Sequence, residues 1–108
     1  MKTQLFERGR LTIKTLSKRK HDLDISIIIN LETRQVSKGN VRLAEVAQCM
    51  LSSKEKQGAI IMLLGAHVLR SGVQNYLIDL MQRGYISCIA TNGAGIIHDF
   101  EFALIGAT

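Results

Sequence analysis

Residues 86–95, ISCIATNGAG, decide the fold of this chain. The first five residues are a short apolar run, and the next five hold two glycines, Gly93 and Gly95. A glycine-rich turn between a strand and a helix lets backbone N–H groups approach a ligand closely, and it directs the positive end of the helix dipole at a bound anion. The stretch therefore predicts a strand, a ligand-binding turn and a helix in succession.

The helix after this turn is expected to begin near His98. Apolar residues between positions 96 and 104 repeat with helical spacing, which supports that assignment. The acidic side chains of Asp99 and Glu101 would then lie in the first helical turn, where negative charge is favoured.

A second apolar run, residues 59–64 (AIIMLL), ends at Gly65. Continuous rather than alternating apolar character predicts a strand that is buried on both faces, as in a parallel sheet. Apolar residues between positions 73 and 81 repeat with helical spacing, so a helix is expected there, with Ser71 as its N-cap and Gly84 beyond its end.

Two further elements are expected upstream. Residues 43–51 show the spacing of an amphipathic helix, with Asn40 as its N-cap and Gly58 at its C′ position. Residues 23–31 alternate apolar and polar side chains, interrupted only at Ile28, and this predicts an extra strand with one buried face.

The alternation of helices and strands after residue 40 predicts an α/β fold, a Rossmann-like parallel sheet with flanking helices. The two buried strands should be neighbours, joined by a right-handed crossover. The segments 65–67 and 91–95 both leave the carboxyl ends of these strands, so they should meet at one edge of the sheet. Open α/β sheets bind ligands at that edge.

The charge of the chain is concentrated near its N-terminus. The 108 residues carry a net charge of +5, and residues 1–20 hold seven basic side chains against Glu7 alone, which leaves −1 for the rest. We therefore divide the chain into a basic arm (1–20) and a partial, truncated α/β domain (21–108). The arm is interpreted either as a solvated tail or as a segment that binds nucleic acid or an acidic surface.

The remaining composition is that of an ordinary globular protein, with 46% apolar residues. No apolar run is long enough for a membrane span, and no signal peptide is recognisable, so a cytoplasmic location without membrane contact is expected. Cys49 and Cys88 lack metal-ligand spacing, and they are interpreted as buried, reduced thiols. No metal site is expected.

Three ordered stretches resemble a known family: residues 64–72 (LGAHVLRSG), 76–84 (YLIDLMQRG) and 90–101 (ATNGAGIIHDFE). Together they resemble the N-terminal part of deoxyhypusine synthase, and more closely its bacterial deoxyhypusine synthase-like relatives. The resemblance covers roughly residues 58–108. It implies a Rossmann-like fold, homo-oligomeric assembly, NAD as cofactor, and transfer of an aminobutyl group from spermidine to a protein lysine or another amine.

The resemblance also implies which residues contact ligands. The residues expected at the NAD site are Gly65, His67, Ser71, Thr91, Asn92, Gly93 and Ala94. His98 is a weaker candidate for contact with the polyamine substrate, because two glutamates of the family are replaced here by Ile97 and His98. The nucleophilic lysine and the catalytic histidine of the family have no counterpart in this chain, so no catalytic residue is assigned and the isolated chain is expected to be inactive.

Other interpretations stay open at this stage. His67 and His98 are equally interpreted as hydrogen-bonding groups at the end of a strand and the start of a helix. The chain as a whole is alternatively a non-catalytic assembly module that oligomerises through its open sheet edge, or a nucleic-acid-binding protein that uses the basic arm.

Overall fold

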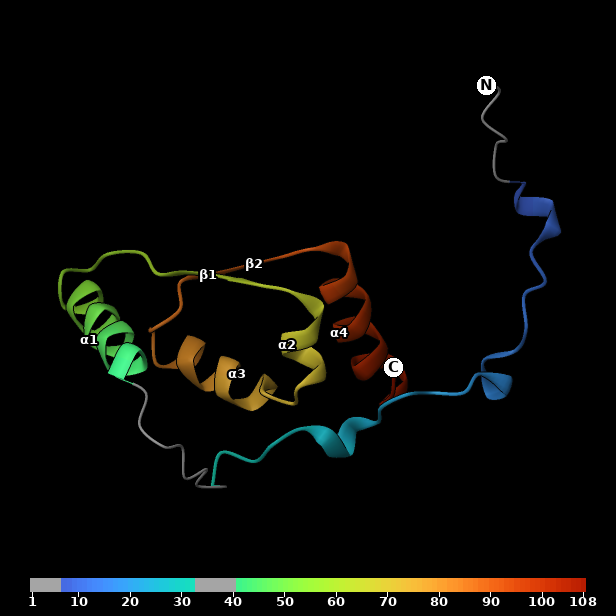
Figure 1. Cartoon of the computed structure of the whole chain (residues 1–108), viewed down its shortest axis with the longest axis horizontal. Coiled ribbons are helices and arrows are strands. Elements are labelled where there is room, and N and C mark those ends of the chain that lie inside the picture. The colour runs from blue at the N-terminus through green and yellow to red at the C-terminus, as the bar shows by residue number, and fades with distance from the viewer. Residues whose placement is uncertain (1–6, 33–40) are drawn as a thin grey trace.

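The computed structural model describes residues 7–32 and 41–108. Four α-helices, two strands and three short 3-10 helices follow one another in the described part of the chain (Figure 1). In order they are η1 (Arg8–Arg10), η2 (Leu16–Lys18), η3 (Ile25–Ile27), α1 (Val41–Glu55), β1 (Ile61–Leu64), α2 (Ala66–Arg70), α3 (Gln74–Gln82), β2 (Cys88–Thr91) and α4 (Gly93–Ile105).

The two strands form a parallel sheet, in which Ile61 pairs with Cys88 and Leu64 pairs with Thr91. The connection between them contains α2 and α3, as a parallel pair requires. This arrangement confirms the predicted Rossmann-like α/β fold and the predicted pairing of the two strands.

The core lies between this sheet and the two helices of the crossover. Its buried members come from α2, α3 and the approach to β2: Leu69, Leu77 and Ile86. Partly buried side chains complete it: Met62, Leu64, Val68, Val73, Leu80 and Ile89. In Figure 1 the helices lie on one side of the strands.

The opposite face of the sheet is open. Ile61 and Leu63 point away from the core and keep 59% and 79% of their surface exposed. The expectation that both faces of the strands are buried is therefore wrong for the described residues, because the helices that follow β1 cover only the face that carries Met62 and Leu64.

A helix was missed directly after β1. Residues assigned to a loop form α2, and Ser71 is the C-cap of this short helix rather than the N-cap of the next one. The N-cap of α3 is Val73, which makes no side-chain cap hydrogen bond. Ser71 instead donates its hydroxyl proton to the carbonyl oxygen of Val68 at 2.6 Å, an alternative that serine offers readily near a helix end.

The last helix begins five residues earlier than predicted, at Gly93 instead of His98. Asn92 is its N-cap, and the side-chain oxygen of this asparagine accepts a hydrogen bond from the Gly95 amide at 3.0 Å. Such a cap stabilises a first turn that contains two glycines. Asp99 and Glu101 consequently lie beyond the first turn, and the first turn itself contains no acidic residue. The expectation that these two side chains lie in the first turn is therefore wrong.

Residues 19–29 form a strap across the far ends of α2 and α4, and the strand predicted for residues 23–31 is absent there. Only Asp24 makes a β-bridge, to Ala107, and η3 follows immediately. Backbone hydrogen bonds join the strap to Thr108, Gly106 and Gly72. The strap is held at these separate points, so a continuous ladder does not form.

Helix α1 confirms the helix predicted around residues 43–51, but none of its residues is buried and most of its side chains are exposed. Lys54 attaches it to the rest of the fold, because its ammonium group lies 4.0 Å from the centre of the Tyr85 ring. The left-handed residue after this helix is Gln57 (φ 56°), not Gly58. The expected N-cap, Asn40, lies outside the described residues.

Cys49 and Cys88 are free thiols, but both are exposed, so the expected burial is wrong. Across residues 7–32 and 41–108, no helix has the length and apolar character needed to cross a membrane.

Candidate functional site at the carboxyl edge of the sheet

Two turns leave the sheet side by side. Leu64 and Thr91 are the last paired residues of their strands, and Gly65 and Asn92 follow them as the N-caps of α2 and α4. Adjacent strands lie about 4.8 Å apart, so both helices begin at the same edge of the sheet. The predicted juxtaposition of residues 65–67 with residues 91–95 is confirmed.

The turn at the start of α4 leaves backbone donors accessible. Asn92 uses its side chain for the Gly95 amide and its carbonyl oxygen for the Ile96 amide. The amides of Gly93 and Ala94 have no acceptor among the described residues, which is the ordinary condition of the first residues of a helix. These donors and the helix dipole favour an anion in front of the turn.

Glycine provides open space on both turns. A Cβ atom placed on Gly93 or on Gly65 would meet no atom within 4 Å. The absence of side chains at these two positions therefore leaves room that no neighbouring residue in the described structure fills. That room fits a group which approaches the backbone closely, such as a pyrophosphate.

Gly95 has a different role from Gly93. A Cβ atom on Gly95 would lie 2.2 Å from Oγ1 of Thr91, far inside van der Waals contact. Gly95 is also buried, unlike Gly93. The second glycine of the turn is thus needed because helix α4 lies very close to the end of β2.

A small cavity of about 190 Å³ lies behind this edge. Most of its lining is apolar, from β1, α2, α3, β2 and α4: Leu64, Leu69, Leu77, Ile89, Gly95 and Ile96. Thr91 and Asp99 supply its polar groups. Asp99 was not among the predicted site residues, and the shift of the helix start explains why: with α4 beginning at Gly93, Asp99 lies about two turns into the helix and beside the cavity.

The other predicted site residues lie in different places. His67 is exposed in α2, next to the Gly65 turn. Ser71 lies at the opposite end of α2, with its hydroxyl bonded to Val68. The structure therefore brings Gly65, His67 and residues 91–94 to one edge, and it places Ser71 away from them.

His98 belongs to a polar cluster that connects α4 with the strap. Its Nδ1 lies 2.6 Å from Oγ1 of Thr108, and that hydroxyl donates to Glu101. Glu101 also accepts a hydrogen bond from Arg19 of the arm. The Arg19 hydrogen bond, followed by that from Thr108, lowers the pKa of Glu101 to about 2. A role for His98 in substrate binding stays a prediction.

The described part of the chain contains no group of three or more His, Cys, Asp or Glu residues that is arranged to hold a metal ion. This edge of the sheet therefore offers a ligand three kinds of contact. The glycine turns supply backbone donors for an anion, and the cavity supplies apolar walls and one carboxylate.

The family model for arginine dihydrolase ArgZ-like proteins, C-terminal, Rossmann fold, matches residues 44–108. No curated protein and no solved structure matches significantly.

This match overturns the assignment to deoxyhypusine synthase, since it covers all the residues on which that resemblance depended. Aminobutyl transfer from spermidine, and the hypusine chemistry associated with it, are withdrawn with the assignment. The resemblance misled because strand, glycine turn and helix recur in many nucleotide-binding folds. The match gives no support to an assembly module joined at the sheet edge or to a nucleic-acid-binding protein.

Proposed function

The chain belongs to the family of arginine dihydrolase ArgZ-like C-terminal Rossmann-fold domains, and from this premise we propose that its carboxyl edge binds a nicotinamide dinucleotide, NAD. The observation that carries the proposal is the pair of open glycines, Gly65 and Gly93, at the ends of two adjacent parallel strands. Rossmann folds bind the pyrophosphate of a dinucleotide at such turns.

Each part of the edge has a distinct task in this proposal. The amides of Gly93 and Ala94 donate to the pyrophosphate, and Gly65 leaves space for it on the neighbouring turn. Thr91 and Asp99 offer hydrogen-bonding groups to a ribose, since a carboxylate accepts from hydroxyl groups but repels phosphate. Bound NAD would supply a hydride acceptor, and the chain would contribute binding and orientation.

His67 and Asn92 have more limited roles in the proposed NAD site. His67 is exposed beside the Gly65 turn, so its imidazole is available to a ligand there. Asn92 acts on the ligand through the backbone, because its side chain is already committed to capping α4. Ser71 is not included in the proposed site.

The test is a calorimetric titration of the full chain with NAD, ADP-ribose and inorganic pyrophosphate. Gly93→Val places a branched side chain in the open space, and we expect it to weaken NAD and ADP-ribose binding at least about tenfold, or 1.4 kcal/mol. Ala103→Val places the same branched side chain at an exposed position of the same helix and is expected to leave binding unchanged.

Three results would contradict the proposal. If the folded chain does not bind NAD at millimolar NAD concentration, the proposed function is wrong. Equal affinity of the Gly93→Val and Ala103→Val variants for NAD would show that NAD does not bind at the Gly93 turn. Pyrophosphate binding without any additional affinity for NAD would show an anion site that does not recognise a dinucleotide.

A further inference from the structure

The strap connects the far ends of the two helices that begin at the candidate site. Helices α2 and α4 start at the carboxyl edge of the sheet and run away from it toward the strap (Figure 1). At the end of α4, the strap amide of Ile25 donates to the carbonyl oxygen of Gly106 at 2.8 Å. Just past the end of α2, the strap amide of Ile29 donates to the carbonyl oxygen of Gly72, also at 2.8 Å. One short segment therefore holds both helix ends through its backbone.

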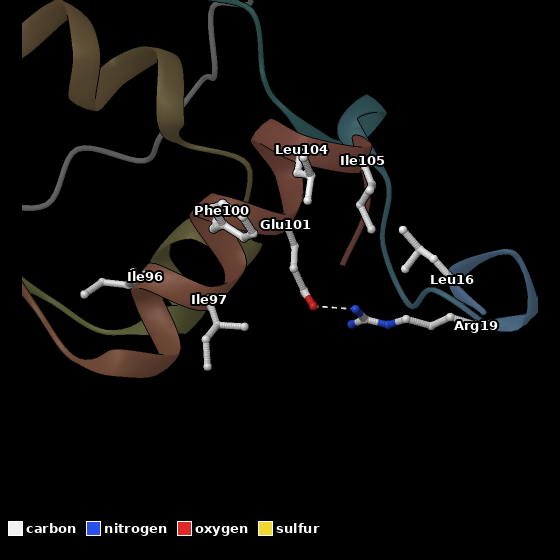
Figure 2. Close-up of a pocket in the computed structure, with 8 residues that line it drawn as sticks. All are labelled: Leu16, Arg19, Ile96, Ile97, Phe100, Glu101, Leu104 and Ile105. Atoms are coloured by element: carbon white, nitrogen blue, oxygen red, sulfur yellow. Dashed lines mark hydrogen bonds and ion pairs between the residues drawn. The ribbon is translucent and has the colours of Figure 1, made fainter. Parts of the chain in front are cut away.

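Side chains of the strap reach the same two helices. Arg19 forms an ion pair with Glu101 of α4, and Figure 2 shows this contact. Asp22 forms a second ion pair with Arg70 of α2, at 3.5 Å. Because exposed ion pairs contribute little energy, the attachment depends mainly on the backbone bonds and on packing. Four apolar side chains of the strap are half-buried: Leu23, Ile27, Ile28 and Ile29.

Helix α2 depends on the strap more than α4 does. It has only 5 residues, and its N-cap, Gly65, supplies no side-chain hydrogen bond, whereas α4 has 13 residues and a side-chain cap. The strap lies directly on the turn that follows α2, because Gly72 is buried and a Cβ atom there would lie 2.1 Å from the carbonyl oxygen of Ile27. The side chain of Asn75, in α3, adds a hydrogen bond to the carbonyl oxygen of Ile29 at 3.0 Å.

We propose that the strap is a clamp for the candidate site: it fixes the Gly65 turn relative to the Gly93 turn, so that ligand binding and closure of the strap favour each other. The inference rests on the proposed function, in which a pyrophosphate lies between the two turns. A ligand that contacts both turns needs them at one separation. Helix α2 is only about 7.5 Å long, so a change at its strapped end reaches the Gly65 turn directly. Any difference in ligand affinity between the closed and open strap acts in both directions.

Ile29→Pro releases the strap from α2 and leaves the glycine turns unchanged. The substitution removes the amide that bonds to Gly72, and Ile28 (φ −69°, ψ 117°) already has a backbone conformation that suits a following proline. Ile13→Pro is the matched control, because Ile13 lies in the arm and is 94% exposed. Circular dichroism checks that both variants are folded. Asn75→Ala, which removes only the side-chain bond to the strap, replaces Ile29→Pro if that variant does not fold.

Two measurements follow the clamp, and the first needs no ligand. The Val68 amide donates to the carbonyl oxygen of Gly65 at 3.1 Å, so its hydrogen exchange reports on the Gly65 turn. We expect this exchange to be at least about fivefold faster in Ile29→Pro than in Ile13→Pro. In calorimetry, Ile29→Pro should bind NAD at least about fivefold more weakly than Ile13→Pro, and saturating NAD should slow exchange of the Ile29 amide in the unmodified chain by a similar factor.

The two measurements separate failure of the clamp from failure of the proposed function. Equal exchange of the Val68 amide in the two proline variants would overturn the clamp. Equal NAD affinity of these variants would overturn its link to ligand binding. If the unmodified chain does not bind NAD, the proposed function is wrong, and exchange of the Val68 amide alone then decides whether the strap fixes the Gly65 turn.

Discussion

The contact between Gly95 and Thr91 gives a sharp prediction about stability. In Gly95→Ala, the new Cβ atom would lie 2.2 Å from Oγ1 of Thr91, where ordinary contact begins at 3.4 Å. Thr91 must then turn or the helix must move away, and overpacking of this kind costs about 1–3 kcal/mol. Alanine is about 1 kcal/mol better than glycine in a helix, so we expect a net loss of up to about 2 kcal/mol.

The partner residue makes the test quantitative. In a Thr91→Ala background the clashing oxygen is gone, and Gly95→Ala should become neutral or stabilising by up to about 1 kcal/mol. The coupling free energy between positions 91 and 95 should therefore be about 1–3 kcal/mol, outside ordinary additivity. Gly93→Ala, where the new Cβ meets no atom within 4 Å, is the matched control and should cause no loss.

Urea denaturation followed by circular dichroism measures all four members of this cycle. With a slope of about 1–2 kcal/mol/M, the loss in Gly95→Ala should lower the midpoint by up to roughly 2 M. A coupling free energy below about 0.5 kcal/mol would refute the reasoning, since the effect of Gly95→Ala would then not depend on Thr91. Stabilisation by Gly95→Ala with Thr91 in place would refute it as well.

Three further perturbations have defined outcomes. Gly72 has a left-handed backbone (φ 79°), and in Gly72→Ala the new Cβ atom would lie 2.1 Å from the carbonyl oxygen of Ile27. We therefore expect this variant to detach the strap and to accelerate hydrogen exchange of the Ile29 amide. Gly84→Ala is the control: it has the same backbone cost of about 1–2 kcal/mol (φ 70°) but open space around the new Cβ atom, so the Ile29 amide should stay protected. Because the pKa of Glu101 falls from 4.5 to about 2 on folding, its charge stabilises the fold above pH 4.5. This contribution is lost as the pH falls from 4.5 toward 2. The loss of unfolding free energy that Glu101→Gln causes at pH 7 should therefore become smaller over that pH interval. Glu55→Gln is the control, and a loss in Glu101→Gln that does not depend on pH would contradict the argument. Tyr85→Leu removes the ring beneath Lys54 and should lower the free energy of local unfolding of α1 by about 0.5–1 kcal/mol, whereas Tyr85→Phe keeps the ring and should not. Equal hydrogen exchange of the α1 amides in both variants would argue against the contact.

Much of the fold was readable from sequence because the decisive signals were local. The apolar runs before Gly65 and Thr91 identified both strands, and the helix–strand alternation identified their parallel pairing. The predicted strand at residues 23–31 failed for a tertiary reason: Asp24 finds its bridging partner in Ala107, and no neighbouring strand extends the ladder. Alternating polarity indicates a half-buried surface, but it does not identify the partner that covers it.

The candidate site was predicted in position but not in detail. Glycines at 93 and 95 looked equivalent in the sequence, yet one faces open space and the other touches Thr91. That difference arises from the distance between α4 and β2, which no local pattern encodes. Asp99 was likewise misplaced, because the capping strength of Asn92 was not weighed against two glycines in the first turn. The family was misassigned for a similar reason, since a shared turn geometry was taken for shared chemistry.

The strap has a consequence for how the chain folds. Leu23 and Thr108 lie 85 positions apart in the chain and exchange backbone hydrogen bonds. Closing so long a loop costs more chain entropy than pairing β1 with β2, which are separated by one short crossover. We therefore expect the sheet and its two helices to assemble first and the strap to join last. In the native protein the amides of Leu23, Ile25 and Ile29 should exchange through a separate, lower-energy opening, while the core around Leu77 stays closed.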